Sequence, residues 1–177
     1  MTALRCTARL LKALKAKPVA DPAPPTNRLG EWTANLIRVS RSQLVIAVSE
    51  PTRLGIVIDA APYADIPLRI AQRLFKTLLF LGLPAELSAA ESHAMESPEF
   101  AATNSKSVLG TLNQYALEVE CDLRGGLAFS PAALTQRLAD TIVSSPGHIG
   151  APADRVREAF GLPPIDWRAR TSGVNLG

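Results

Sequence analysis

The segment Thr103–Ala116, TNSKSVLGTLNQYA, carries the polar residues of this chain that are best suited to binding an anion. Lys106 and Ser107 stand where a polar loop turns into a run with apolar residues at helical spacing. The free N–H groups of a helix start attract anions, and a lysine and a hydroxyl beside them add to that attraction. We therefore take Asn104, Lys106, Ser107 and Asn113 as a candidate site for an anion, a small ligand or a reaction.

A structural role is the alternative for the same segment, and the spacing favours it. A P-loop needs two glycines before its lysine, and none lies from Leu83 to Val108. The segment would then be a capped core helix, and Gly110 would be explained by close packing against another backbone as well as by a ligand. The side chains available as the cap are Thr103, Asn104, Ser105 and Ser107.

A second candidate site is the basic N-terminus, whose first twenty residues contain no acid. The spacing predicts a helix over Leu4–Lys15 with leucines on one stripe and cations on another. One interpretation is a surface helix with solvated cations, and the other is a helix that contacts phosphates, with Arg28, Arg38 and Arg41 extending the patch. The cations predicted to contact nucleic acid are Arg5, Arg9, Lys12 and Lys15.

The sequence lacks the residue patterns of several other kinds of functional site. The two histidines, His93 and His148, have no neighbouring ligands at metal-site spacing, so we expect no metal. There is no G-x-S-x-G motif and no dinucleotide-binding glycine pattern, so we expect no catalytic residues of those kinds and no cofactor. With only 5% aromatic residues, base-stacking recognition of RNA has no support.

The elements that must position these residues begin with three β-rich runs between Trp32 and Ala60. The turns between them, SRS and EPT, are too short for a crossover helix, so the strands should form an antiparallel meander. Pro98–Thr103 could add a further strand, and Gly55 indicates a bulge or a close contact. The predicted fold class is α+β, with a small antiparallel sheet of three or four strands packed against several helices.

Four helices are predicted after the meander. The strongest is Asp65–Leu83, with Asp65 as its cap, and it is followed by an acidic helix over Pro84–Met95 that exposes Glu86 and Glu91. The helix Ser107–Leu123 should bury one face, and the helix from Ser130 to Ser144 another. The inward residues of these last two helices are Val108, Leu112, Tyr115, Val119, Leu134, Leu138 and Ile142.

The sequence suggests one domain over residues 1–145 and a loosely packed or partly disordered extension over residues 146–177. No apolar run approaches the length of a membrane span, and a cytoplasmic location is the default expectation. Cys6 and Cys121 show no metal or redox spacing, and the sequence leaves open whether they are close.

The chain resembles an uncharacterised family of small bacterial proteins, a domain of unknown function, over about Leu4 to Ser145. The resemblance rests on a basic N-terminal segment, a W-x-A-N-L strand and an N-x-x-S-V-L-G-x-x-N segment, where some members carry arginine in place of Lys106. It implies that the basic N-terminus belongs to the domain, and it implies no particular activity. The matching residues are Trp32, Ala34, Asn35, Leu36, Asn104, Ser107, Val108, Leu109, Gly110 and Asn113.

These observations favour a non-enzymatic accessory or adaptor protein that binds another macromolecule, most readily another protein and not a membrane. The first alternative is a protein that binds the nucleic-acid backbone through its basic N-terminus. The second is a small-ligand or enzymatic site within Asn104–Asn113.

Overall fold

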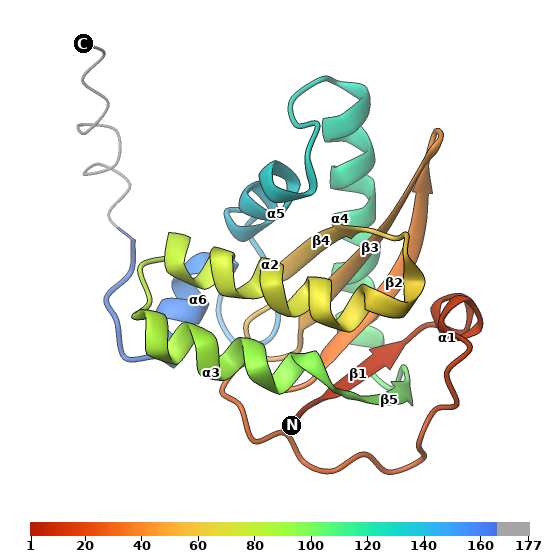
Figure 1. The fold of residues 1–177 in the computed structure, drawn as a ribbon. Helices are drawn as coiled ribbons and strands as arrows, with labels where there is room; N and C mark the ends of the chain where they lie inside the picture. The colour runs from red at the N-terminus through yellow and green to blue at the C-terminus, as the bar shows by residue number, and fades with distance from the viewer. Residues whose placement is uncertain (166–177) are drawn as a thin grey trace.

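The computed structural model describes residues 1–165, and the predicted extension beyond Ile165 lies outside the described residues. The chain forms a sheet with helices on both faces (Figure 1). The strands are β1 (Ala3–Cys6), β2 (Trp32–Val39), β3 (Ser42–Ser49), β4 (Gly55–Asp59) and β5 (Glu99–Ala102). The helices are α1 (Ala8–Leu14), the 3₁₀ turn η1 (Tyr63–Asp65), α2 (Ile66–Phe80), α3 (Ala85–Glu96), α4 (Lys106–Arg124), α5 (Pro131–Ala139) and α6 (Pro152–Ala159).

The sheet is mixed, with strand order β4-β3-β2-β1-β5. The predicted meander is confirmed, because β3 pairs antiparallel with both β2 and β4. The α+β class is also confirmed, but the prediction of a purely antiparallel sheet of three or four strands is wrong. Strand β1 lies between β2 and β5 and is parallel to both of them.

The start of the chain is a strand where a helix was predicted. Leu4 and Cys6 alternate with Arg5 along β1, and both of them are buried in the core. Only the seven residues of α1 are helical, so the helix predicted from Leu4 begins in fact at Ala8, and its leucines pack against the core. A four-residue strand followed closely by a seven-residue helix mimics one longer helix in the sequence pattern, because both elements are too short to show a distinct periodicity.

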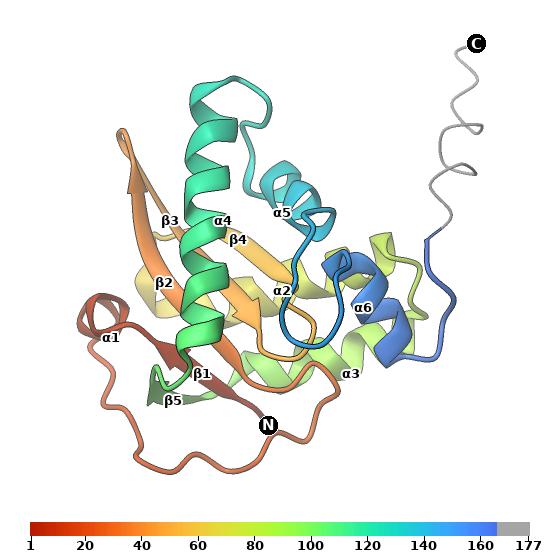
Figure 2. The ribbon, with the colours of Figure 1, turned by 180° about the vertical axis from the view of Figure 1, so that it is seen from behind.

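Strand β3 explains why its sequence is almost continuously apolar. Leu44, Ile46 and Val48 belong to the cluster beneath α4 and α5, while Val45 and Ala47 belong to the cluster beneath α2. Because successive side chains of a strand point to opposite faces, a strand covered by helices on both sides needs apolar residues at every position. Figure 2 shows α4 lying across the second face of the sheet.

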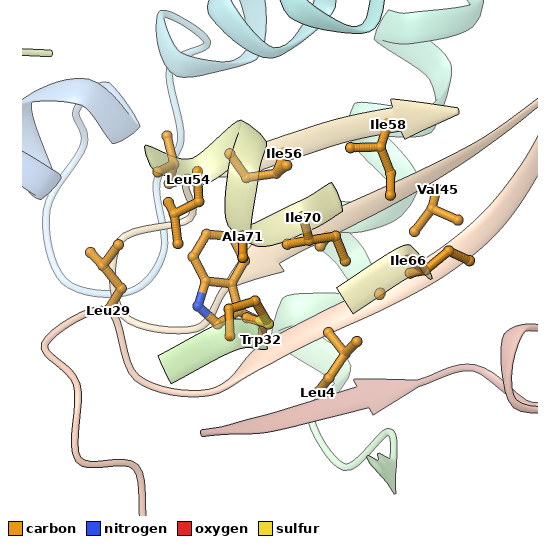
Figure 3. Close-up of a cluster of buried hydrophobic side chains, with 14 of the residues drawn as sticks. Leu4, Leu29, Trp32, Val45, Leu54, Ile56, Ile58, Ile66, Ile70 and Ala71 are labelled. Atoms are coloured by element: carbon orange, nitrogen blue, oxygen red, sulfur yellow. The ribbon is translucent and has the colours of Figure 1, made fainter. Parts of the chain in front are cut away.

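Helix α2 covers the first face and encloses the larger core. Ile70 and Leu74 are fully buried, and the indole of Trp32 packs beneath Ala71 and beside Leu29 (Figure 3). The predicted stripe of α2 is confirmed, although the side chain of Asp65 makes no capping hydrogen bond. The stripe consists of Ile66, Ile70, Leu74, Leu78 and Leu81, all buried.

Helix α3 contains a buried carboxylate that sequence reasoning placed in solvent. Glu91 is only 5% exposed, and it accepts hydrogen bonds from the backbone N–H groups of Arg28 and Leu29 and from Asn27 Nδ2. These bonds hold the end of the proline-rich connector, the segment between α1 and β2, against the domain. The partners were invisible in the sequence because they lie far away along the chain.

Helix α4 buries the predicted face of Val108, Leu112, Tyr115 and Val119 against the sheet. The ring of Tyr115 packs directly against Gly55 on β4, where an added Cβ would lie only 3.0 Å from the ring. This is the close contact predicted at Gly55. The predicted burial of Ile142 is wrong, because α5 ends at Ala139 and the Ile142 side chain is 61% exposed.

The described part of the predicted extension packs against the domain. Ala153 and Val156 of α6 are fully buried in the same cluster as Trp32 and Leu74. Residues 152–156 therefore contribute to the core, which is closer packing than the sequence indicated. The division of the chain at residue 145 stays a prediction.

The two outer strands, β4 and β5, form hydrogen bonds with groups outside the sheet. The N–H of Val19 donates to the carbonyl of Phe100 on β5 at 2.8 Å. On β4, the N–H of Val57 donates to the hydroxyl of Thr135 from α5 at 2.9 Å. These bonds satisfy backbone groups that a sheet edge otherwise leaves unpaired.

Candidate functional site

The structure divides the predicted site at the start of α4 into two parts. Asn104, Lys106, Ser107 and Asn113 are all exposed, but the Ser107 hydroxyl accepts a hydrogen bond from the buried Arg53. Ser105 is the N-cap, accepting from the N–H of Val108 at 3.3 Å. The predicted site residues are therefore not brought together around one ligand.

Ser107 belongs to what we call the arginine network, formed by Arg53, Arg155, Ser107 and Ser145. The guanidinium of Arg53 donates to Ser107 Oγ at 2.8 Å, to the Ser145 carbonyl at 3.2 Å and to the Glu50 carbonyl at 2.5 Å. Arg53 lies in the turn between β3 and β4 with φ +62°, a left-handed conformation that is rare for arginine. Its bonds to three segments hold it there.

Arg155 organises the loop that follows α5. Its guanidinium donates to the carbonyls of Val143, Ser145 and His148, and the residue is only 6% exposed. Arg53 is 2% exposed, and no ion pair within residues 1–165 includes either arginine. Backbone carbonyls therefore accept most of the hydrogen bonds that the two guanidiniums donate.

The electrostatics of the network agree with a structural role. Burial lowers the pKa of Arg53 and the nearby Arg155 lowers it further, while Glu50 opposes both effects. Burial also raises the pKa of Tyr115, whose hydroxyl donates to the Arg53 carbonyl at 2.7 Å. The network joins the β3–β4 turn, the start of α4 and the loop before α6.

The predicted cations of the basic N-terminus lie on two different elements, β1 and α1. Arg5 lies on β1, and its guanidinium forms a bidentate pair with Glu31 at 2.5 and 3.1 Å, so the prediction that it lies on a basic helix is wrong. Arg9, Lys12 and Lys15 are exposed on α1 and at its C-cap. Three of the four predicted cations are therefore available to a partner.

Further cations gather around Asp59, at the end of β4. A hollow of about 410 Å³ is lined by Arg38 and Arg41 from the β2–β3 hairpin. A second hollow of about 150 Å³, here called the α2 notch, is lined by Arg69, Gln72, Arg73 and Lys76 of α2. Asp59 lines both hollows and is the only acid among the described residues that line them.

Contacts link this region to α1. Helix α1 contacts η1, and the Tyr63 hydroxyl in η1 donates to Gln43 Oε1 of the hairpin at 2.6 Å. Figure 1 shows α1, the hairpin tip and the first turn of α2 towards the same end of the molecule. We call these cations together the basic face: Arg9, Lys12, Lys15, Arg38, Arg41, Arg69, Arg73 and Lys76.

Sequence reasoning found part of the basic face. Arg38 and Arg41 were expected to extend the N-terminal patch, and the α2 cations follow from helical spacing opposite the apolar stripe. The sequence could not show that the hairpin cations and the α2 cations both lie beside Asp59. That arrangement depends on the pairing of β3 with β4 and on the position of α2 after β4.

A larger hollow of about 420 Å³ lies between α4 and α5. Its lining includes Glu118, Cys121 and the bidentate pair of Asp122 with Arg137. Cys121 is an exposed free thiol and Cys6 a buried one, whose pKa burial raises to about 12. Within residues 1–165, no three potential ligand residues are arranged to hold a metal ion, and no helix is long and apolar enough to cross a membrane.

The chain matches, over residues 3–155, the family described as a domain of unknown function (DUF6933). The chain belongs to this family. The match covers every strand and the start of α6, and thus contains the basic face and the arginine network. Neither the curated proteins nor the solved structures give a match to this DUF6933 chain.

The two motifs by which the chain resembles its family now have places in the fold of this DUF6933 domain. Trp32, Ala34 and Leu36 of the first motif are buried in the core, and Asn35 accepts a hydrogen bond from the Thr7 hydroxyl at 2.7 Å. In the second motif, a Cβ at Gly110 would meet open space, so close packing does not explain that glycine. Each motif thus combines core residues with a polar residue that bonds to a distant segment, Asn35 to Thr7 and Ser107 to Arg53.

Proposed function

We propose that this DUF6933 protein is a non-enzymatic accessory protein that binds a nucleic acid through its phosphate backbone. The observation that carries the proposal is the pair of adjoining hollows, in which five cations surround the single carboxylate of Asp59. Arg9, Lys12 and Lys15 extend the same charge along α1.

The chemistry of the basic face suits phosphates better than bases. Arginine and lysine bind phosphate oxygens and release condensed counterions, a contribution that carries no sequence information. Specific readout of single strands uses aromatic side chains as stacking platforms. Among the residues that line the two hollows there is no aromatic ring, so we propose binding that is independent of base sequence.

Filter binding with a short duplex and a single-stranded oligonucleotide tests the proposal. We expect affinity to fall steeply as salt rises, and the double variant Arg38→Gln/Arg41→Gln to reduce the salt slope by roughly two, because each arginine is expected to neutralise one phosphate. The matched control is Arg124→Gln, which removes an exposed cation paired with Glu120 and distant in the chain from the basic face. No binding at low salt, or an equal reduction in the control, overturns the proposal.

Binding to another protein is the second candidate function, favoured by the surface around the α4–α5 hollow. Leu117 lines the hollow and is 65% exposed, and three further apolar side chains in the segments that follow α4 and α5 are 61% to 79% exposed: Leu127, Phe129 and Ile142. The hollow itself is lined by Glu118, Asp122 and Asp140 against Arg137, an excess of acids. These features suit a basic amphipathic helix of a partner protein.

Calorimetric titration with a synthetic basic amphipathic peptide tests this second candidate. We expect binding that Leu117→Ser and Phe129→Ser each weaken and that Leu68→Ser, an exposed apolar residue on α2, leaves unchanged. Equal binding by an acidic peptide of the same apolar pattern excludes this partner chemistry. Sedimentation of the protein alone separates this outcome from self-association through the same surface.

A further inference from the structure

The α2 notch differs from the rest of the basic face because its two arginines are partly buried and its three cations share one small hollow. Arg69, Arg73 and Lys76 follow each other at steps of four and three, so they lie along one face of α2. The hollow of about 150 Å³ is far smaller than the 300–1,000 Å³ typical of sites for drug-sized ligands. Its size therefore favours a small ion or a single chemical group.

The two arginines of the notch have different bonding. The guanidinium of Arg69 donates to the carbonyls of Asp59, Ala60 and Pro62, so it fixes the turn between β4 and α2. The guanidinium of Arg73 makes no hydrogen bond or ion pair within residues 1–165, and its Nε is buried without a partner. An arginine that is partly removed from water and left unbonded is unfavourable unless another group satisfies it.

The charge of the notch identifies the chemical class of that group. Three cations and the carboxylate of Asp59 leave a net charge of +2 in the lining. A phosphate group carries up to two negative charges and several acceptor oxygens, and the planar fork of arginine matches two of those oxygens at once. Lys76, which is exposed, can reach a third oxygen as a flexible point charge.

We propose that the α2 notch binds one phosphate group, with Arg73 as its main donor and Lys76 and the charge of Arg69 in support. The phosphate can belong to a nucleic-acid backbone or to a small phosphorylated molecule, and the site chemistry is the same for both. The notch lies within the basic face, but its binding of phosphate does not depend on the proposed nucleic-acid function.

Titration calorimetry and thermal unfolding with inorganic phosphate at constant ionic strength test the site. We expect phosphate, but not the same ionic strength of chloride, to raise the unfolding temperature of the natural sequence. Arg73→Gln should weaken phosphate binding about tenfold, the loss of about 1.4 kcal/mol that a charge-assisted hydrogen bond supplies. Because the guanidinium of Arg73 makes no bonds within the described residues, this variant should unfold at the same urea concentration as the natural protein.

Lys76→Gln and Arg38→Gln complete the set, the first removing an exposed cation of the notch and the second a cation of the neighbouring hollow. We expect Lys76→Gln to weaken phosphate binding and Arg38→Gln to leave it within twofold. Unchanged phosphate affinity in both Arg73→Gln and Lys76→Gln overturns the proposal, as does an equal effect of chloride.

A mononucleotide and an oligonucleotide separate the sources of the phosphate and also separate this proposal from the proposed function. If phosphate and mononucleotide bind at the notch but the oligonucleotide does not, the nucleic-acid function fails and the notch stands. If the oligonucleotide binds with an affinity that Arg73→Gln leaves unchanged, and phosphate does not bind, the notch proposal fails and the basic face stands.

Discussion

Arginine side chains are bonded differently in the arginine network and in the α2 notch. In the network, Arg53 and Arg155 are almost fully buried, and their guanidiniums donate to backbone carbonyls of the β3–β4 turn and of the loop after α5 and to the Ser107 hydroxyl. In the notch, Arg73 is partly buried and its guanidinium has no bonding partner within the described residues. The position of a cation in the sequence does not separate these cases, but the bonding of its donors does.

The comparison predicts the largest change in stability for Arg155→Gln. The substitution leaves the carbonyls of Val143, Ser145 and His148 without their donor, at a cost of about 3 kcal/mol in the free energy of unfolding. Urea unfolding measures this cost, with Arg73→Gln as the matched control that should change stability by less than about 0.5 kcal/mol. Equal effects of the two substitutions would show that the contrast between network and notch is false.

Tyr115→Phe tests the support beneath the network. The hydroxyl of Tyr115 donates to the carbonyl of Arg53, a buried residue held at positive φ. Removing that hydroxyl leaves a buried acceptor unsatisfied, so we expect a loss of about 1–2 kcal/mol in the same unfolding experiment. Phosphate affinity should be unchanged, and a loss of affinity would show that the network and the notch are coupled.

Gly110→Ala should act in the opposite direction. A Cβ at this position meets open space, and alanine is favoured over glycine within a helix by about 1 kcal/mol. The variant should therefore unfold at a higher urea concentration than the natural protein. If the variant is more stable but binds an oligonucleotide more weakly, the surface of α4 around Gly110 takes part in binding.

Asp59→Asn gives the smallest expected effect and changes the charge of both hollows that Asp59 lines. Removing the one carboxylate of the lining should strengthen phosphate binding about threefold, because a like charge several ångströms away opposes an anion by somewhat less than 1 kcal/mol in water. Calorimetric titration checks the change. Weaker binding in this variant would mean that Asp59 positions the cations of the notch.

Much of the fold follows from short-range sequence patterns. The meander, α2 and α4 were predicted because the β-branched runs and the apolar residues at helical spacing lie within single segments. Strand β1 was missed because its partners, β2 and β5, come from later parts of the chain. A four-residue strand has too little pattern of its own to reveal such pairing.

The candidate sites were less predictable for the same physical reason. The exposure of Lys12 and Lys15 follows from the amphipathic pattern of α1, but the pairing of Arg5 with Glu31 depends on the parallel register of β1 with β2. Glu91 was expected in solvent and is instead buried by backbone donors of a distant connector. The role of each charged residue depends on contacts between segments that lie far apart in the sequence.

The coverage of the outer strands has a consequence for how partners can approach. Partners that extend a sheet by adding a β-strand need a row of unpaired backbone groups along its edge. Here the middle of β4 is occupied by the Thr135 hydroxyl, and β5 is bonded to the connector at Val19. Recognition through the side chains of helices and hairpin tips is therefore the mode that this sheet favours, and it makes the molecule resistant to edge-to-edge assembly with its own copies.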